Sequence, residues 1–184
     1  MMIFQITERK ESDMITVEKT SLEGVLLIKP SVFEDFRGEY IETYNEDIYR
    51  QNGITIKFIQ DDISVSRKNV LRGLHGDSET WKLISCLHGC FYLAVVNCDT
   101  DSTDFGTWEG FTLSDKNRHQ VLIPPKYGNG HAVMSDTTIF HYKQSAYYNP
   151  QKQFSYRWDD PKLNVWWPVK DPILSRRDEA GRYV

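Results

Sequence analysis

Residues 81–97 read WKLISCLHGCFYLAVVN, two apolar runs on either side of a His88-Gly89 pair. Short runs that are rich in aromatic and branched apolar side chains are typical of β-strands. A short connection that contains glycine is typical of a tight turn between paired strands. We therefore predict strands over residues 81–87 and 91–97, joined as a β-hairpin.

The same kind of pattern continues on both sides of this segment. Asn45 is placed to cap a short helix over residues 45–51, which Gly53 would end. Short strands with turn signals about every ten residues indicate an all-β sandwich or barrel with few helices, not alternating β-α units. Further strands are expected at residues 24–30, 33–44 (after a turn), 54–58, 62–66, 70–74, 107–113, 120–124, 130–134, 138–146 and 154–158.

The length of 184 residues, 40% of them hydrophobic, suits one domain that spans residues 1–184. Residues 1–20 are mixed and charged, and we expect an N-terminal arm or a first edge strand there. Residues 160–184 contain several prolines and end in a polar stretch, so an irregular C-terminal segment is expected.

Charge and cysteine content restrict the partners. A formal net charge of −4 argues against a nucleic-acid or anionic-membrane surface, but not against a small anionic ligand. Three cysteines (86, 90 and 98) form no even disulfide framework, which favours a reduced, cytoplasmic location. No apolar run approaches the roughly 18 residues of a membrane span, and the first ten residues do not resemble a signal peptide.

His75 is the first candidate for chemistry. It follows Arg72-Gly73, where the glycine lets the backbone enter a crowded interior. A neutral imidazole can remove a carbon-bound proton. The alternative is an ordinary buried histidine, but Arg72, Asp77 and Lys82 make the surroundings too polar for an ordinary core strand.

Three further residues offer complementary groups, each with a simpler explanation. Lys82 would stabilise a developing enolate oxygen, or it is a solvated lysine on a strand. Tyr142 would return a proton to carbon, or it lines a barrel with its hydroxyl satisfied. Asp178 would orient an imidazole, or it is a solvated charge in the C-terminal tail.

Two other groups have weaker patterns. Arg37, Arg72 and Arg177 could hold a diphosphate through paired hydrogen bonds, or they are scattered surface arginines. Cys86-x-His88-x-Cys90 resembles a metal triplet, but Gly89 indicates a turn and no fourth ligand has clear spacing, so no metal site is predicted.

An ordered set of short motifs runs through most of residues 22–180. The motifs are Phe33-x-Asp35-x-Arg37-Gly38-x-Tyr40-x-Glu42, Gln60-Asp61-Asp62-Ile63-Ser64-x-Ser66, Val70-Leu71-Arg72-Gly73-Leu74-His75, Asp99, Ser102, Phe105-Gly106-x-Trp108, Ile123-Pro124, Tyr148-Asn149-Pro150, Trp158-x-Asp160-Pro161, Trp167-Pro168 and Leu174-Ser175-x-x-Asp178. With this set the chain resembles the dTDP-4-dehydrorhamnose 3,5-epimerase family. The resemblance implies a double-stranded β-helix (jelly-roll or cupin) barrel with short peripheral helices, a homodimer, and no metal or organic cofactor. It also implies a nucleoside-diphosphate 4-keto-6-deoxy sugar as substrate.

Carried over by position, the resemblance assigns roles. His75 would be the base, Asp178 its partner, Tyr142 the acid on the other face of the sugar ring, and Lys82 the cation beside the enolate. The substrate-binding residues that it implies are Arg37, Glu42, Gln60, Asp62, Arg72, Asn129, Gln153 and Arg177.

Several positions depart from the family pattern. Gly128-Asn129-Gly130-His131 stands where the family usually has Ala-His-Gly-Phe, and Gly76-Asp77 follows the central histidine in place of an aromatic residue and glutamine. Asp62 replaces an asparagine, and Gln153 a glutamate. These changes resemble a branch that acts on GDP-4-keto-6-deoxy-heptoses in capsule synthesis. The room left by Gly76, and by Asn129 in place of an imidazole, would suit a larger sugar.

Several functions therefore remain open. The preferred one is inversion of C3, C5 or both in a nucleotide-linked 4-keto sugar, for synthesis of a surface polysaccharide. A GDP-4-keto-6-deoxy-heptose is preferred to dTDP-4-keto-6-deoxyglucose as that sugar. The alternatives are a 3,4-ketoisomerase on the same barrel, a non-catalytic sugar-nucleotide-binding cupin and a metal-dependent cupin.

Overall fold

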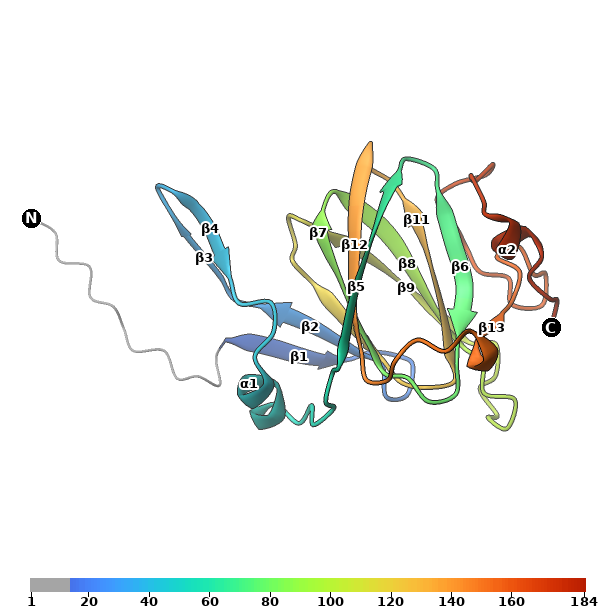
Figure 1. The fold of residues 1–184 in the computed structure, drawn as a ribbon, viewed down its shortest axis with the longest axis horizontal. Coiled ribbons are helices and arrows are strands. Elements are labelled where there is room, and N and C mark those ends of the chain that lie inside the picture. The colour runs from blue at the N-terminus through green and yellow to red at the C-terminus, as the bar shows by residue number, and fades with distance from the viewer. Residues whose placement is uncertain (1–13) are drawn as a thin grey trace, which may run out of the picture.

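Two antiparallel β-sheets face each other in the computed structural model, which describes residues 14–184 (Figure 1). The six-stranded sheet has the order β1 (Ile15–Lys19), β2 (Leu26–Pro30), β10 (Gln120–Ile123), β7 (Lys82–His88), β12 (Thr137–Gln144) and β5 (Gln60–Arg67). The five-stranded sheet has the order β13 (Phe154–Ser155), β6 (Leu71–Gly76), β11 (Tyr127–Val133), β8 (Cys90–Asn97) and β9 (Trp108–Ser114). The predicted all-β barrel with short peripheral helices is therefore confirmed.

The remaining elements are small. A two-stranded hairpin, β3 (Val32–Asp35) and β4 (Gly38–Ile41), extends away from the barrel (Figure 1). The short helices are α1 (Glu46–Gln51), α2 (Arg176–Glu179) and the 3-10 turn η2 (Pro150–Lys152). Asn45 caps α1 by accepting from the Asp47 and Ile48 N–H groups, as the sequence predicts.

The main core lies between the two sheets, because alternate side chains of each strand point to this inner side. Ile84 and Cys86 of β7 meet Leu93 and Val95 of β8 in one buried cluster. Leu83 points the other way, into a second cluster that α1 covers on the outer face of the six-stranded sheet. The apolar run of β7 is nearly continuous because both of its faces are buried.

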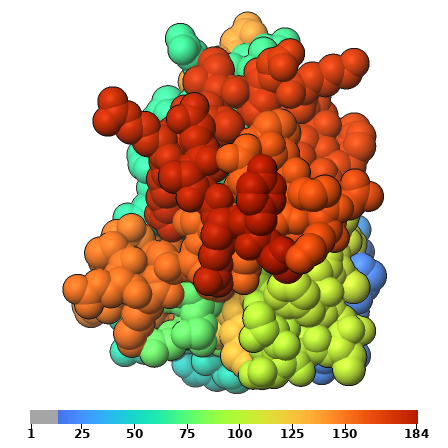
Figure 2. All heavy atoms as spheres, turned by 90° about the vertical axis from the view of Figure 1, so that its right-hand side faces the viewer, coloured from blue at the N-terminus to red at the C-terminus, as the bar shows by residue number. Residues whose placement is uncertain are grey.

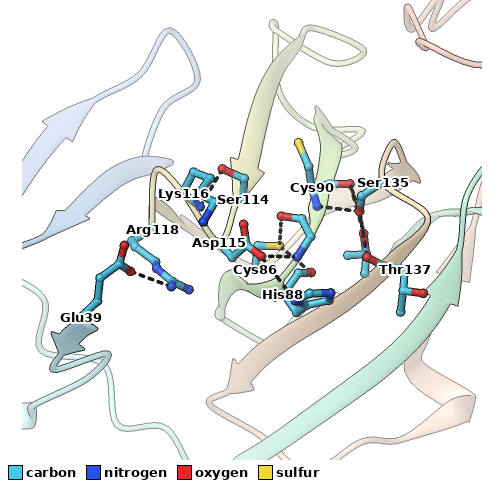
Figure 3. Close-up of polar contacts among 12 residues, drawn as sticks. Glu39, Cys86, His88, Cys90, Ser114, Asp115, Lys116, Arg118, Ser135 and Thr137 are labelled. Carbon is cyan, nitrogen blue, oxygen red and sulfur yellow. Dashed lines mark hydrogen bonds and ion pairs between the residues drawn. The ribbon is translucent and has the colours of Figure 1, made fainter. Parts of the chain in front are cut away.

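The predicted hairpin over residues 81–97 is wrong in its pairing. β7 pairs with β10 and β12, whereas β8 pairs with β11 and β9, so the two strands belong to different sheets. The groups at the turn also bond to other segments: the Gly89 N–H donates to Asp115, and the Cys90 N–H donates to the Ser135 hydroxyl (Figure 3). Two buried strands next to each other in sequence can turn between sheets as readily as within one.

Two other sequence predictions need correction. Residues 54–58 form no strand. Their alternation arises because Ile54, Ile56 and Phe58 pack against the second core cluster. The segment 33–44 forms both strands of the β3–β4 hairpin and not a single strand.

β1 is the first strand of the described chain and lies at one edge of the six-stranded sheet. An arm or edge strand is predicted over residues 1–20, of which residues 1–13 lie outside the described part of the chain. Residues 160–184 are irregular apart from α2, and the C-terminal part of the chain spreads over one face of the barrel (Figure 2, orange to red). Among residues 14–184, none of the helices has the length and apolar character required to cross a membrane.

Gly73 on β6 provides a test of how closely the barrel is packed. Its φ is +139°, and a Cβ atom there would overlap the Cα of Gly130 on β11. We expect Gly73→Ala to lower the free energy of unfolding by roughly 3 kcal/mol or more, from backbone strain and overpacking together. Chemical denaturation measures the change.

Gly53→Ala is the matched control, because Gly53 also has a positive φ (+84°) but has open space where its Cβ would lie. We expect a cost of about 1 kcal/mol there, from backbone strain alone. Equal losses in the two variants would contradict the close approach of β6 and β11.

Candidate active site

A cavity of about 280 Å³ opens between the two sheets, and eight of the twelve predicted site residues line it. All four residues predicted to do chemistry are among them. The eight are Arg72, His75, Lys82, Asn129, Tyr142, Gln153, Arg177 and Asp178.

The close approach of two glycines makes room for His75. Gly73 on β6 and Gly130 on β11 lie against each other, where a side chain on either would collide with the neighbouring strand. Asn129 of β11 pairs with His75 of β6, and the register of the two strands shifts between Asn129 and His131. Both side chains line the cavity.

Asp178 reaches His75 from the C-terminal helix α2. Asp178 Oδ1 lies 2.8 Å from His75 Nε2, which is an ion-pair distance. The ring N–H does not point at the oxygen closely enough to form a hydrogen bond. The same oxygen accepts from the Gly73 N–H at 3.0 Å, while Oδ2 accepts from Ser175, the residue that caps α2. The carboxylate is therefore fixed from three sides.

The charge of Asp178 is stable despite its burial. Burial alone raises the pKa of this carboxyl, but the contacts with His75, Ser175 and the Gly73 N–H outweigh it and lower the pKa to about 2. Asp178 is thus ionised at neutral pH and would stabilise a protonated His75.

Lys82 is a buried cation at the start of β7. Its side chain is on the same face of the strand as Ile84, toward the cavity, and its Nζ donates to Asn129 Oδ1 at 3.1 Å. Burial lowers the pKa of Lys82 to about 8, Asp77 opposes this shift, and Arg177 adds to it. The ammonium group is charged near neutral pH and sits where solvent screens it little.

Tyr142 enters the cavity from the opposite sheet to His75. It lies on β12 of the six-stranded sheet, whereas His75 lies on β6 of the five-stranded sheet. Burial raises the pKa of the phenol, and the nearby Asp62 and Tyr148 raise it further. The phenol therefore stays protonated at neutral pH and is available as a donor.

The polar residues at the rim are held by hydrogen bonds to neighbouring side chains. Arg72 Nε donates to Ser66 Oγ at 3.1 Å, and Arg177 Nε donates to Ser155 Oγ at 3.0 Å. Each guanidinium has terminal nitrogens beyond the one used, which are suited to a phosphate.

Four predicted binding residues do not line the cavity. Gln60 and Asp62 are close by on β5, where Gln60 Nε2 and Gln144 Nε2 both donate to one oxygen of Asp62. Arg37 is part of the β3–β4 hairpin and pairs with Asp35, and Glu42 follows β4. Within one chain this hairpin extends away from the barrel (Figure 1).

Gly76 and Asp77 have structural explanations. The position of a Cβ on Gly76 would coincide with the Phe154 ring and the Tyr127 carbonyl, so the glycine leaves no room for a larger sugar. Asp77 accepts from the Glu79 and Thr80 N–H groups and from Gln153 Nε2, which holds the turn after β6. This removes the main steric argument for a heptose.

Sequence reasoning missed half of the cavity lining, because most of these residues read as ordinary strand or core positions. His131 replaces a phenylalanine in a recognisable motif. Ile63, Ser64, Tyr148 and Ser175 stand in the matching motifs, which assigned them no role. The missed residues are Ile63, Ser64, Ile84, His131, Phe140, Gln144, Tyr148 and Ser175.

The Cys86-x-His88-x-Cys90 triplet lies at the turn from β7 to β8. Cys86 Sγ donates to the His88 and Gly89 carbonyls, and His88 lies beside Asp115 (Figure 3). Burial raises the pKa of Cys86 to about 12, with Asp115 adding to the shift, so the thiol holds its proton. Among the described residues, no three His, Cys, Asp or Glu side chains gather as metal ligands would.

The cavity thus combines a carboxylate-paired imidazole, a protonated phenol from the facing sheet and a buried ammonium group. This set can remove a proton from carbon, stabilise the resulting oxyanion and return a proton from another side. It favours proton transfer next to a carbonyl group.

Comparison with known proteins agrees with this chemistry. A family model described as dTDP-4-dehydrorhamnose 3,5-epimerase matches residues 19–184. A protein of that name from Methanothermobacter thermautotrophicus is 39% identical over 165 residues, which cover 87% of this chain and 89% of the relative. A dTDP-4-dehydrorhamnose 3-epimerase from Streptomyces niveus is 32% identical over 86% of this chain and 78% of its own length.

A solved structure extends the likeness to the backbone. The dTDP-6-deoxy-D-glucose-3,5-epimerase of Legionella pneumophila, in complex with dTDP-4-keto-L-rhamnose, superposes with a TM-score of 0.87. It is 35% identical, and the match covers 92% of each chain. The chain therefore belongs to the dTDP-4-dehydrorhamnose 3,5-epimerase family and is an isomerase of nucleotide sugars.

Proposed function

We propose that the cavity inverts C3, C5 or both in a nucleoside-diphosphate 4-keto-6-deoxy sugar, without a cofactor. The observation that carries this proposal is that His75 and Tyr142 enter one cavity from opposite sheets, with Lys82 beside them. An acid and a base on different sides of a ring are what inversion of a carbon centre requires.

The steps follow from the C4 carbonyl, which acidifies the hydrogens on C3 and C5. His75 takes one of these protons, the C–H electron pair moves toward the carbonyl oxygen, and an enolate forms. Lys82 offsets the charge on that oxygen, and Asp178 offsets the charge on the imidazolium. Tyr142 then donates its proton to the same carbon from the other face, and the carbonyl re-forms.

The nucleotide we propose is dTDP. The relatives described above are named for dTDP sugars, and Gly76 gives no extra room for the heptose that the sequence motifs suggested. Arg72 and Arg177 would bind the diphosphate, with Asn129 and Gln153 near the sugar. A binding screen of dTDP, GDP and UDP separates the pathways, and a preference for GDP would restore the heptose proposal.

A role in surface polysaccharide synthesis and a cytoplasmic location stay predictions.

Deuterium exchange tests the reaction directly. We expect the protein in D₂O to place deuterium at C3 or C5 of dTDP-4-keto-6-deoxyglucose, as NMR of the product would show. His75→Asn should slow this exchange by about 10²- to 10⁴-fold, because it removes the base. Tyr142→Phe should slow one centre more than the other.

Two outcomes would contradict the epimerase proposal. The first is no deuterium gain with the wild-type protein on dTDP-, GDP- or UDP-linked 4-keto sugars, which would favour a non-catalytic binding protein. The second is a product whose carbonyl has moved from C4 to C3, which would indicate a ketoisomerase.

The pH dependence tests the role of Lys82. Because burial lowers the pKa of Lys82 to about 8, the ammonium group is charged below that pH and loses its proton above it. We expect the exchange rate to fall as pH rises through 8, by roughly tenfold per pH unit. The Lys82→Met variant should exchange slowly at every pH, and its exchange rate should not fall as the pH rises through 8.

Lys143→Met is the control, because Lys143 pairs with Asp61 outside the cavity. It should keep the wild-type pH profile. A wild-type rate that stays constant from pH 7 to pH 10 would refute the assignment of Lys82.

We also infer that the active form is a homodimer in which the β3–β4 hairpin reaches the cavity of the second copy. Arg37 and Glu42 lie away from the cavity of their own chain. The hairpin exposes 98% of Phe36 and 66% of Tyr40, a large apolar area for a surface hairpin. β5 is an edge strand that exposes Ile63 and Val65, which offers a further surface for association.

Complementation between two impaired variants tests this dimer. Arg37→Ala should raise KM, and His75→Asn should be inactive. After refolding the two together, one complete site forms per mixed dimer, so about a quarter of the wild-type activity should return. No recovery, or a monomer in analytical ultracentrifugation, would refute the exchange of hairpins.

A further inference from the structure

His131 and Ser64 are two cavity residues that the proposed reaction does not use. Both line the cavity, His131 from β11 and Ser64 from β5. His131 Nε2 and Ser64 Oγ are fully buried, and neither has a hydrogen-bond partner among the described residues. They are called the deep pair below.

The ring of His131 is held in one orientation. It stacks on Phe140 with ring centroids 4.1 Å apart and planes 11° apart, and Phe91 lies 5.3 Å from it. Only 3% of the residue is exposed. Ser64 is the cross-strand partner of Phe140, so both members of the deep pair lie around the same aromatic ring.

The imidazole of His131 is neutral at physiological pH. Burial lowers its pKa to about 3, with Arg72 and His75 adding to the shift and Asp178 opposing it. A neutral imidazole nitrogen and a hydroxyl group each form hydrogen bonds without carrying a charge. The deep pair therefore suits an uncharged polar group.

An unpaired buried polar atom costs about 1–3 kcal/mol. Such a cost is usually offset when the site is occupied. A sugar hydroxyl can both donate and accept, so it can bond to His131 Nε2 in either tautomer and to Ser64 Oγ. A methyl group would leave both atoms unpaired, and a phosphate would place a charge against a ring that stays neutral.

We propose that His131 and Ser64 bind one hydroxyl group of the sugar, and that they select a hydroxylated 4-keto sugar over its deoxygenated analogue. This inference rests on the proposed function, since it names a further determinant of the substrate. His131 occupies a motif position where the resemblance leads one to expect phenylalanine, so the selectivity belongs to this chain's own sequence.

The principle behind the selectivity is a difference in hydrogen bonding. A site built to bond a hydroxyl group discriminates strongly against a substrate that lacks it, because the site's buried polar atoms are then left unpaired. An apolar ring at position 131 would have no such atom and would tolerate either substrate.

The test compares three substrates: dTDP-4-keto-6-deoxyglucose, its 2-deoxy analogue and its 3-deoxy analogue. Deuterium uptake next to the carbonyl gives kcat/KM for each of them. We expect wild-type protein to use one of the two analogues at least about tenfold less efficiently than the parent sugar. The weak analogue identifies the hydroxyl group that the deep pair contacts.

His131→Phe keeps an aromatic ring against Phe140 and removes the nitrogen. It should lower kcat/KM for the parent sugar by about tenfold and leave the weak analogue unaffected, so that the preference disappears. Ser64→Ala should have the same pattern and serves if His131→Phe fails to fold.

His141→Phe is the matched control. His141 lies on β12, next to the strand β5 that carries Ser64. Its Nδ1 contacts Ser85 Oγ at 2.9 Å, and it does not line the cavity. It should keep the wild-type preference among the three substrates.

Equal kcat/KM for all three substrates in wild-type protein would overturn the inference, as would an equal loss on all three in His131→Phe. In both cases the exchange itself would still support the epimerase. Absence of exchange with every substrate would instead refute the proposed function, and this inference with it.

Discussion

The carboxylate of Asp178 is the contact on which the site depends. It joins the cap of helix α2, the Gly73 N–H of β6 and the imidazole of His75, three groups from two distant parts of the chain. Because the carboxylate is buried and ionised, each of these contacts compensates part of its desolvation. The C-terminal segment is thereby anchored to the barrel at His75, the residue that we propose as the base.

The two sheets of the barrel carry different polar groups of the cavity. The five-stranded sheet supplies the imidazole, and the six-stranded sheet supplies the phenol and the ammonium group. The distance between groups on facing sheets is fixed, since the pairing of each strand within its own sheet determines where its side chains lie. A ring that enters between the sheets would therefore meet the proposed base and the proposed acid on different sides.

Most strands could be predicted from the sequence, because apolar runs and turn residues are local signals. Their pairing could not, as the residues 81–97 show: burial on both faces makes β7 and β8 look like neighbours although they belong to different sheets. In the site, His75 and Lys82 carried a signal because polar groups interrupt apolar strands. Phe140 carried none, and Ser64 stands in a matching motif that gave it no role, since only the three-dimensional arrangement turns these two toward the cavity.

The strand order has a consequence for how the protein acquires its activity. Apart from β1 with β2 and β8 with β9, neighbours within the two sheets are far apart in the chain. Barrels dominated by such non-local pairing fold slowly, on the order of milliseconds to seconds. Neither sheet can be completed from one continuous stretch, so His75 on β6 and Tyr142 on β12 come to face one cavity only when both sheets have formed.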